Sequence, residues 1–256
     1  MIARIARHIA MGLLAAIGML VAPNPGGMVA RALAQSVDTP VGQSPHERLL
    51  ATFHNEELTN AAADSAIAAM IRLIVTGNPA IDALAEQDAT LLTDLAANSR
   101  PFMLEWVRDS ARLATPRQLV VLRNALNDEE AGRMADFYAT DLARELTVAT
   151  IRANDYAASA NLGNLDEPID AEDLSADLTR AATRAALARE YTPEEQAALA
   201  KLVTDPAFAK FQSVRSDLSA IAAKVENRAF SPEQEAQFTQ IIAQTFAAHG
   251  LGNESE

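Results

Sequence analysis

The same helix-start pattern occurs twice in this chain, 65 residues apart. The first copy runs from Asn127 to Glu130 and reads Asn-Asp-Glu-Glu; the second runs from Thr192 to Glu195 and reads Thr-Pro-Glu-Glu. In each copy a residue that favours the N-cap position is followed, three positions later, by a Glu that can bond back to the cap amide. Apolar residues follow both starts at helical spacing. The repeat therefore predicts two helix starts and a helical architecture.

The stretches that follow the two starts also share their apolar spacing. With the same offset of 65, Met134 pairs with Leu199, Phe137 with Leu202 and Leu146 with Phe211. This similarity fits an internal duplication. It equally fits two unrelated helices with the same start chemistry, because acidic residues in a first turn are favoured by the helix dipole. Both interpretations stay open.

Helical spacing continues along almost the whole chain after residue 43. Ser44 and Ser231 are further N-cap candidates, each followed by Pro and, at the third position, by Glu or Gln. Pro101 and Pro116 are expected to begin new helices, since proline is favoured in a first turn. No stretch alternates convincingly between apolar and polar residues. The pattern predicts an all-α protein without a sheet: a helical bundle of about nine helices packed as antiparallel pairs.

The first 34 residues have the organisation of a signal peptide. Arg4 and Arg7 precede an apolar run over 9–22, and small residues precede a cleavage site between Ala34 and Gln35. The run of about 14 residues is shorter than the ~20 that a membrane-spanning helix needs. We expect an exported protein, periplasmic or secreted, with no stable membrane span after cleavage.

The remaining chain divides at two polar stretches. We expect a disordered linker over 35–43, a helical domain over 44–160, a linker over 161–170 that contains Gly163 and Pro168, and a second helical segment over 171–256 that packs on the first.

The composition excludes several kinds of partner and anchor. The chain contains no Cys, so disulfides, thiolate metal sites and an acylated-Cys anchor are excluded. Its net charge is -13, and removal of the three Arg in the leader would lower it to -16. Nucleic acids and anionic lipid surfaces bind basic patches, so neither is an expected partner. We expect an unknown envelope protein as the partner, and the oligomeric state stays open.

The first repeat carries a resemblance to a known family. The run from Asn127 to Glu130, followed by Met134 and by Phe137 and Tyr138, resembles the Thr-Pro-Glu-Glu to Phe-Tyr signature of an exported bacterial helical family known as domain of unknown function 2059. The similar region covers 114–151. It departs from the family pattern after the aromatic pair, where Ser-Pro-x-Gly is replaced by 139–142, Ala-Thr-Asp-Leu. The resemblance implies an exported all-α protein without known catalytic residues.

The polar residues form no recognisable catalytic or metal-binding motif. The paired acids of the two repeats are explained by capping, and His46 and His54 are expected on helix surfaces rather than in a metal site. No phosphate-binding loop, nucleophile elbow or metalloprotease motif occurs. We expect no catalytic residue, no metal site and no cofactor.

Four aromatic residues are the only candidate ligand-binding side chains: Phe102, Trp106, Phe137 and Tyr138. They could line a groove for a small apolar ligand, although aromatic residues one helical turn apart more often pack in a core. We expect a non-catalytic protein that acts through protein contacts in the cell envelope. The alternatives are a carrier of a small apolar ligand between helices and an enzyme with an unrecognised site.

Overall fold

The structure is a computed structural model that describes residues 42–156 and 168–250. These residues form helices joined by short breaks and loops, and they include no strand. The helices are α2 (Pro45–Phe53), α3 (Glu56–Gly77), α4 (Pro79–Gln87), α5 (Leu91–Ala125), α6 (Asp128–Tyr138), α7 (Asp141–Ala153), α8 (Ala171–Leu187), α9 (Pro193–Thr204), α10 (Pro206–Ser213), α11 (Arg215–Glu226) and α12 (Pro232–Ala248). The prediction of an all-α fold without a sheet is confirmed for this part of the chain. The proposed signal peptide, its cleavage site and most of both linkers lie outside the described residues.

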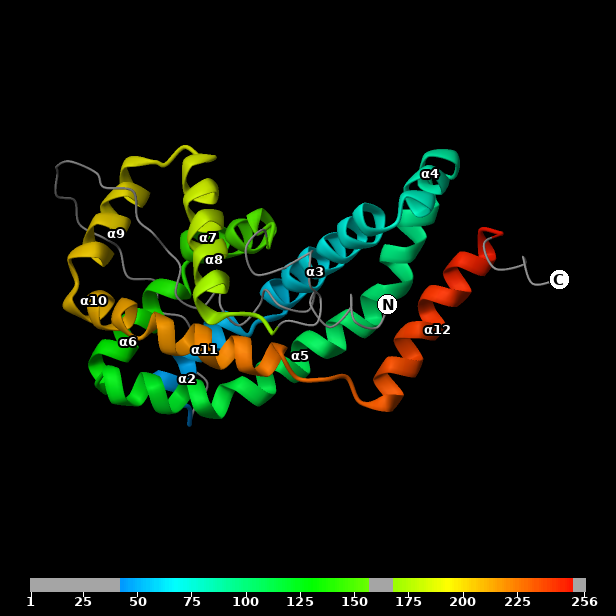
Figure 1. Cartoon of the computed structure of the whole chain (residues 1–256). Helices are drawn as coiled ribbons and strands as arrows, with labels where there is room; N and C mark the ends of the chain where they lie inside the picture. The colour runs from blue at the N-terminus through cyan, green and yellow to red at the C-terminus, as the bar shows by residue number, and fades with distance from the viewer. Residues whose placement is uncertain (1–41, 157–167, 251–256) are drawn as a thin grey trace.

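The 35-residue helix α5 runs through the middle of the molecule and organises the other helices (Figure 1). Helices α3 and α12 pack along its first half, and both run antiparallel to it. Helices α2 and α11 pack on its second half. At the far end of the molecule, α6 packs on α2 and α10, and α8 packs on α7 and α11, so α5 connects both ends of the fold.

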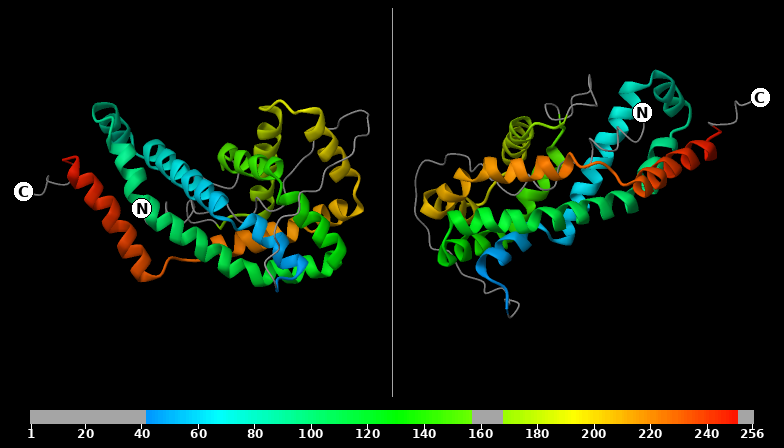
Figure 2. Two further views of the ribbon diagram at one scale, coloured as in Figure 1. Left: turned by 180° about the vertical axis from the view of Figure 1, so that it is seen from behind. Right: turned by 60° about the horizontal axis from the view of Figure 1, so that its bottom comes forward.

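Pro101 and Pro116 lie inside α5, so the expectation that each begins a new helix is wrong. The hydroxyl of Thr115 donates to the carbonyl of Ala111 at 2.8 Å instead of capping a helix start. A proline inside a helix costs about 3 kcal/mol, because it removes one hydrogen bond and crowds the preceding turn. Burial of Phe102 and Trp106 beside Pro101 offsets a cost of this size. The helix bends along its length instead of breaking (Figure 2).

Helices α2 and α3 are covered by other helices of the fold. Helix α2 packs on α6, and α3 packs on α5 and α7. By length and composition, the stretch Pro45–Gly77 could cross a membrane, with a mean hydropathy of 1.4 in its most apolar window, of which 67% is buried in the fold. Core helices of soluble proteins pass the same test, and α2 and α3 are separate helices with their own N-caps, Ser44 and Asn55.

Both predicted helix starts are present, and each carries a complete capping box. A second N-cap follows each start after the same number of residues: Thr140 caps α7 and Asp205 caps α10. The two pairs of caps therefore share the offset of 65 that relates the sequence repeats. Where the chain departs from the family signature, α6 ends at Tyr138 and α7 begins at Asp141.

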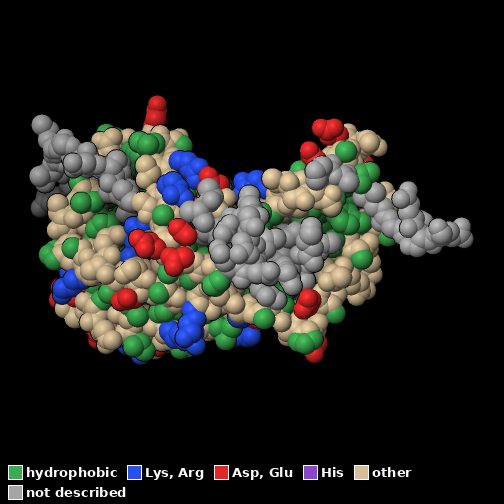
Figure 3. All heavy atoms as spheres, viewed as in Figure 1, with side chains coloured by type: hydrophobic (Ala, Val, Ile, Leu, Met, Phe, Trp, Pro, Cys, Tyr) green, Lys and Arg blue, Asp and Glu red, His purple; other side chains and the backbone are tan. Residues whose placement is uncertain are grey.

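The C-terminal helices are tied to the rest by both ends of α12. At its start, Phe230 and Phe238 pack against Phe102 of α5. At its end, His249 lies 2.5 Å from a carboxylate oxygen of Asp88 and 3.1 Å from one of Asp94, and these carboxylates raise the pKa of the imidazole. Acidic and basic side chains lie in small separate groups on the face shown in Figure 3.

Candidate functional site

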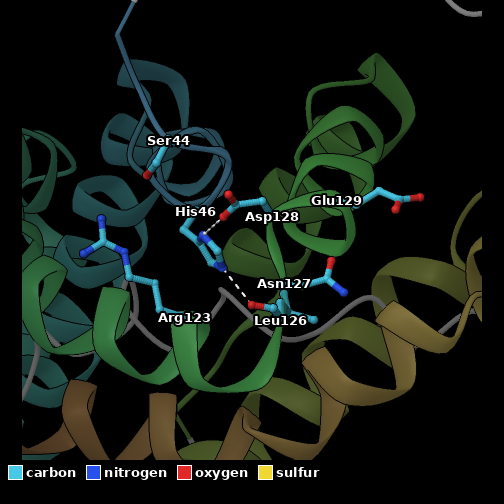
Figure 4. A pocket seen from close by; sticks show the side chains of 7 residues that line it. All are labelled: Ser44, His46, Arg123, Leu126, Asn127, Asp128 and Glu129. Carbon is cyan, nitrogen blue, oxygen red and sulfur yellow. Dashed lines mark hydrogen bonds and ion pairs between the residues drawn. The ribbon is translucent and has the colours of Figure 1, made fainter.

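The structure has an open surface hollow where the N-termini of α2 and α6 come together with the C-terminal end of α5 (Figure 4). Its lining consists of Ser44, His46, Arg123, Leu126, Asn127, Asp128 and Glu129. The hollow includes the start of the first sequence repeat, so any ligand of the paired acids at this repeat would bind here.

The first-turn amides at this hollow are occupied by the chain itself. The amide of Glu47 donates to the Ser44 hydroxyl at 3.3 Å, and the Ser44 amide donates to the Glu47 carboxylate at 2.8 Å. At α6, the Glu130 amide donates to the Asn127 side chain at 2.9 Å, and the Asn127 amide donates to the Glu130 carboxylate at 3.0 Å. These bonds satisfy donors that an anionic ligand would need. The interpretation of the repeated acids as helix-starting residues is confirmed.

His46 fastens α2 to the corner between α5 and α6. Its side chain is 5% exposed, its Nε2 donates to the carbonyl oxygen of Leu126 at 2.9 Å, and its Nδ1 lies 3.5 Å from Asp128. A carbonyl oxygen only accepts, so the proton on Nε2 is fixed by this contact. The expectation of a surface histidine is wrong for His46, because a ring at the second position of α2 points to α6.

His54 is partly buried at the C-terminal end of α2. Its Nδ1 lies 3.3 Å from the hydroxyl of Thr115, and burial lowers the pKa of the imidazole to about 4. A neutral ring is therefore favoured at this position. The expectation of an exposed histidine is wrong here too, because the C-terminal end of α2 packs against α5.

The four candidate aromatic residues lie in two separate clusters. Phe102 and Trp106 pack with Phe230 and Phe238, and the Phe230 ring lies edge-on to both α5 rings at centroid distances of 5.4 and 4.5 Å. Phe102 and Trp106 are 4% and 1% exposed. These two rings therefore form part of the packed junction between α5 and α12.

The second aromatic cluster joins α2, α6 and α10. Tyr138 packs against Phe53 at 4.7 Å and against Phe211 at 5.6 Å between ring centroids, with Phe137 edge-on beside it. Phe137 is partly buried and Tyr138 is 5% exposed. The structure does not bring Phe102 and Trp106 together with Phe137 and Tyr138, so these four residues do not line a common groove.

One carboxyl group is buried in the core at the C-terminal end of α11. Glu226 is fully buried, and the indole Nε1 of Trp106 donates to its Oε2 at 3.4 Å. Burial raises the pKa of Glu226 to about 8, an effect that the nearby Arg228 partly opposes. The carboxyl is thus held protonated near neutral pH, as expected for an acid without water around it.

The residues around Glu226 connect several helices. The guanidinium of Arg228 lies over the Trp106 ring at 3.7 Å and donates to the Ser110 hydroxyl at 3.0 Å. Asn227 forms two hydrogen bonds, of 2.8 and 3.0 Å, with the backbone of Ile169 just before α8. The segment 226–230 therefore locks α5, α11, α12 and the entry to α8 together. A buried acid with a raised pKa can mark an enzyme site, but Glu226 has no exposed atom that a substrate could reach.

Sequence reasoning missed Glu226, although a usable signal is present. Ser219, Ala222 and Glu226 follow one another at spacings of three and four on α11, and the first two are 1% and 0% exposed. An acid in line with small residues on one helix face indicates a closely packed position.

Comparison of the chain with models of known protein families, with curated proteins and with solved structures finds no match in any of the three. The resemblance of residues 114–151 to domain of unknown function 2059 therefore stays a prediction.

Proposed function

We propose that the protein is an exported, non-catalytic protein of the cell envelope that acts through contact with another protein. The observation that carries this proposal is the contrast between its interior and its surface. The candidate aromatic side chains and the paired acids are used in packing and capping, whereas large apolar side chains remain exposed. These are Leu113 at 49%, Val120 at 57%, Leu187 at 76% and Val203 at 46% exposure.

Single exposed apolar side chains are common on soluble proteins, so their arrangement has to be considered. Leu113 and Val120 are two helical turns apart on one face of α5, which makes them neighbours on the surface. Together they form a small apolar patch, and exposed apolar patches are used in contacts with other proteins. The signal-peptide pattern of residues 1–34 supports export.

Export is tested by expressing the full chain with a C-terminal tag and determining the N-terminus of the product. We expect the mature chain to begin at Gln35 and the Ala34→Lys variant to remain uncleaved, because the cleavage site needs small residues. Recovery of the full-length chain in the cytoplasm would contradict export.

Contact with a protein is tested by placing a photo-crosslinking amino acid, one position at a time, at Leu113, Val120, Leu187 and Val203. Irradiation of cells that export the chain should give a protein adduct from at least one position. An exposed position of different character, Glu86 on α4, serves as the background control. Adducts from none of the four apolar positions would contradict the proposal.

A further inference from the structure

The second half of α5 presents an exposed apolar line with arginines on both sides. Leu113, Pro116 and Val120 follow at spacings of three and four, so they lie along one face of the helix. Arg117 lies on one side of this line, and Arg112 and Arg123 lie on the other. All six side chains are exposed. We call this set the α5 ridge; it is about 16 Å long, from the rise of a helix between its first and last residues.

The α5 ridge is basic in an acidic protein. The net charge of the whole chain is -13, whereas the ridge contains three Arg; one acid, Asp109, lies one turn before Leu113 on the same face. Arg112 pairs with Asp109 at 2.7 Å within α5, and Arg123 lies 3.3 Å from Glu47 of α2. Within the described residues no carboxylate lies at ion-pair distance from Arg117.

This arrangement has the composition of a protein contact surface. Contact surfaces are enriched in Arg, whose planar guanidinium pairs with carboxylates, and in apolar residues that exclude water at the centre. The ridge also continues to the hollow at the start of α6, because Arg123 lines both.

We propose that the α5 ridge binds an acidic amphipathic helix of a partner protein. Apolar side chains of that helix, spaced three and four residues apart, pack along Leu113 and Val120. Carboxylates on one flank pair with Arg117, and those on the other flank share Arg112 and Arg123 with Asp109 and Glu47. This inference rests on the proposed function and names the surface and the partner chemistry. The charge of the ridge, opposite to that of a carboxylate-rich helix, carries the choice of partner.

The strength and salt dependence of this contact follow from its size. Three apolar side chains and three arginines are a small part of the roughly 800 Å² that each partner buries in a standard interface. We therefore expect a weak, reversible contact. Exposed charges are screened over about 10 Å at 0.1 M salt, so binding should weaken as salt is raised.

The test uses the purified product of the exported chain and two synthetic helical peptides. Both peptides carry the same leucine stripe; one has glutamates on its flanks and the other has lysines. Fluorescence anisotropy should show binding of the glutamate peptide, and the R112E/R117E variant should bind it at least about tenfold more weakly. The Arg152→Glu variant, changed at an exposed arginine of α7 outside the ridge, should bind like the unchanged protein. Circular dichroism checks that each variant keeps its helices.

Four results would overturn the proposal. Equal binding of the glutamate and lysine peptides would remove the charge argument. Binding of phosphatidylglycerol vesicles with the same dependence on Arg112 and Arg117 would assign the ridge to a lipid surface. If the unchanged protein forms a dimer and the Val120→Ser variant does not, the ridge would be assigned to a second copy of the chain. If the peptides fail while crosslinking succeeds at Leu187 or Val203, the ridge is wrong and the proposed function stands; if every crosslink fails, the proposed function fails as well.

Discussion

The two sequence repeats start their helices in the same way but differ in how they are buried. In the first, α6 buries one side along its whole length, including Met134 and Tyr138, and packs on α2. In the second, α9 buries only Leu199 and Leu202. At the shared offset of 65, Tyr138 is 5% exposed and its counterpart Val203 is 46% exposed. The same start chemistry thus occurs in a well-covered helix and in a sparsely covered one.

The comparison separates local from tertiary effects. A capping box needs only residues within one turn, so it forms in both repeats. Burial needs a partner helix, and α2 supplies one for α6. Not every pair of equivalent positions differs in burial: Met134 and its counterpart Leu199 are 1% and 2% exposed. The four predictions that follow test this separation, from the largest expected effect to the smallest.

Substitution of the equivalent positions Tyr138 and Val203 by Ala should give the largest contrast. Tyr138→Ala removes a ring that packs against Phe53 and Phe211, so we expect a loss of about 3–5 kcal/mol in the free energy of unfolding. Val203→Ala should change it by less than about 0.5 kcal/mol, because the side chain is half exposed. Urea denaturation followed by circular dichroism measures both.

Tyr138→Phe is the control for the ring itself. The Tyr138 hydroxyl is buried without a hydrogen-bond partner in the described residues, so its removal should leave stability equal or slightly higher. An equal loss for Val203→Ala and Tyr138→Ala would show that the two repeats are buried alike.

The next effect concerns Glu226 in α11, the helix that follows the second repeat. Burial raises the pKa of Glu226 to about 8, above the ordinary value that applies in the unfolded chain. Between these values the folded state keeps a proton that the unfolded state has lost, so this group lowers stability as pH rises, by up to about 1.4 kcal/mol per pH unit. Above pH 8 both states are ionised and the loss stops.

Glu226→Gln removes this titration. His54 has a pKa lowered to about 4 and gives the opposite slope up to its ordinary value of 6.5, so the comparison is cleanest above that pH. From pH 6.5 to 8, the advantage of Glu226→Gln over the unchanged protein should grow by about 2 kcal/mol. Denaturation curves across this range measure it, with Glu105→Gln, an exposed acid of α5, as the matched control. A constant difference across the range would mean that Glu226 is not buried as described.

The two N-caps should have similar, smaller effects despite the difference in burial. Asn127→Ala and Thr192→Ala each remove one side-chain acceptor for a first-turn amide, at a cost of about 1 kcal/mol. Asn127→Ser and Thr192→Ser keep an acceptor and should restore most of it. A several-fold larger loss for Asn127→Ala in urea denaturation would show that cap strength depends on tertiary packing.

The smallest effect concerns the ion pair that links the two repeats. The guanidinium of Arg133 on α6 bonds both carboxylate oxygens of Asp205, the cap of α10, at 2.9 and 3.2 Å. The pair is partly exposed, so a double-mutant cycle with Arg133→Ala and Asp205→Ser should give a coupling below about 1 kcal/mol. Arg133 holds the pKa of Asp205 below its ordinary value, so the coupling should persist to acidic pH and disappear as Asp205 becomes protonated. A coupling unaffected by salt or acid would contradict an electrostatic origin.

Much of the fold could be predicted from the chain because helix starts are local. The caps at Ser44, Asn127, Thr192 and Ser231 all lie where the pattern indicates, since each needs only a side-chain oxygen and an acid or amide three positions on. The candidate site was harder to predict. The four aromatic residues could be identified as large apolar side chains. Nothing in their spacing indicates that Phe102 and Trp106 pack beside α12, whereas Phe137 and Tyr138 pack beside α2.

The sequence by itself determined the helical class and where most helices begin, because hydrogen bonds within one turn and apolar spacing act over a few residues. Only the tertiary structure decided that α5 continues through Pro101 and Pro116, that His46 and Glu226 are buried, and that the face around Leu113 and Val120 stays exposed. These outcomes depend on which helices meet across the fold. Burial against a distant segment can offset the free-energy cost of a proline inside a helix or of a buried carboxyl group. That stabilisation depends on residues far away in the sequence, so a local pattern does not predict it.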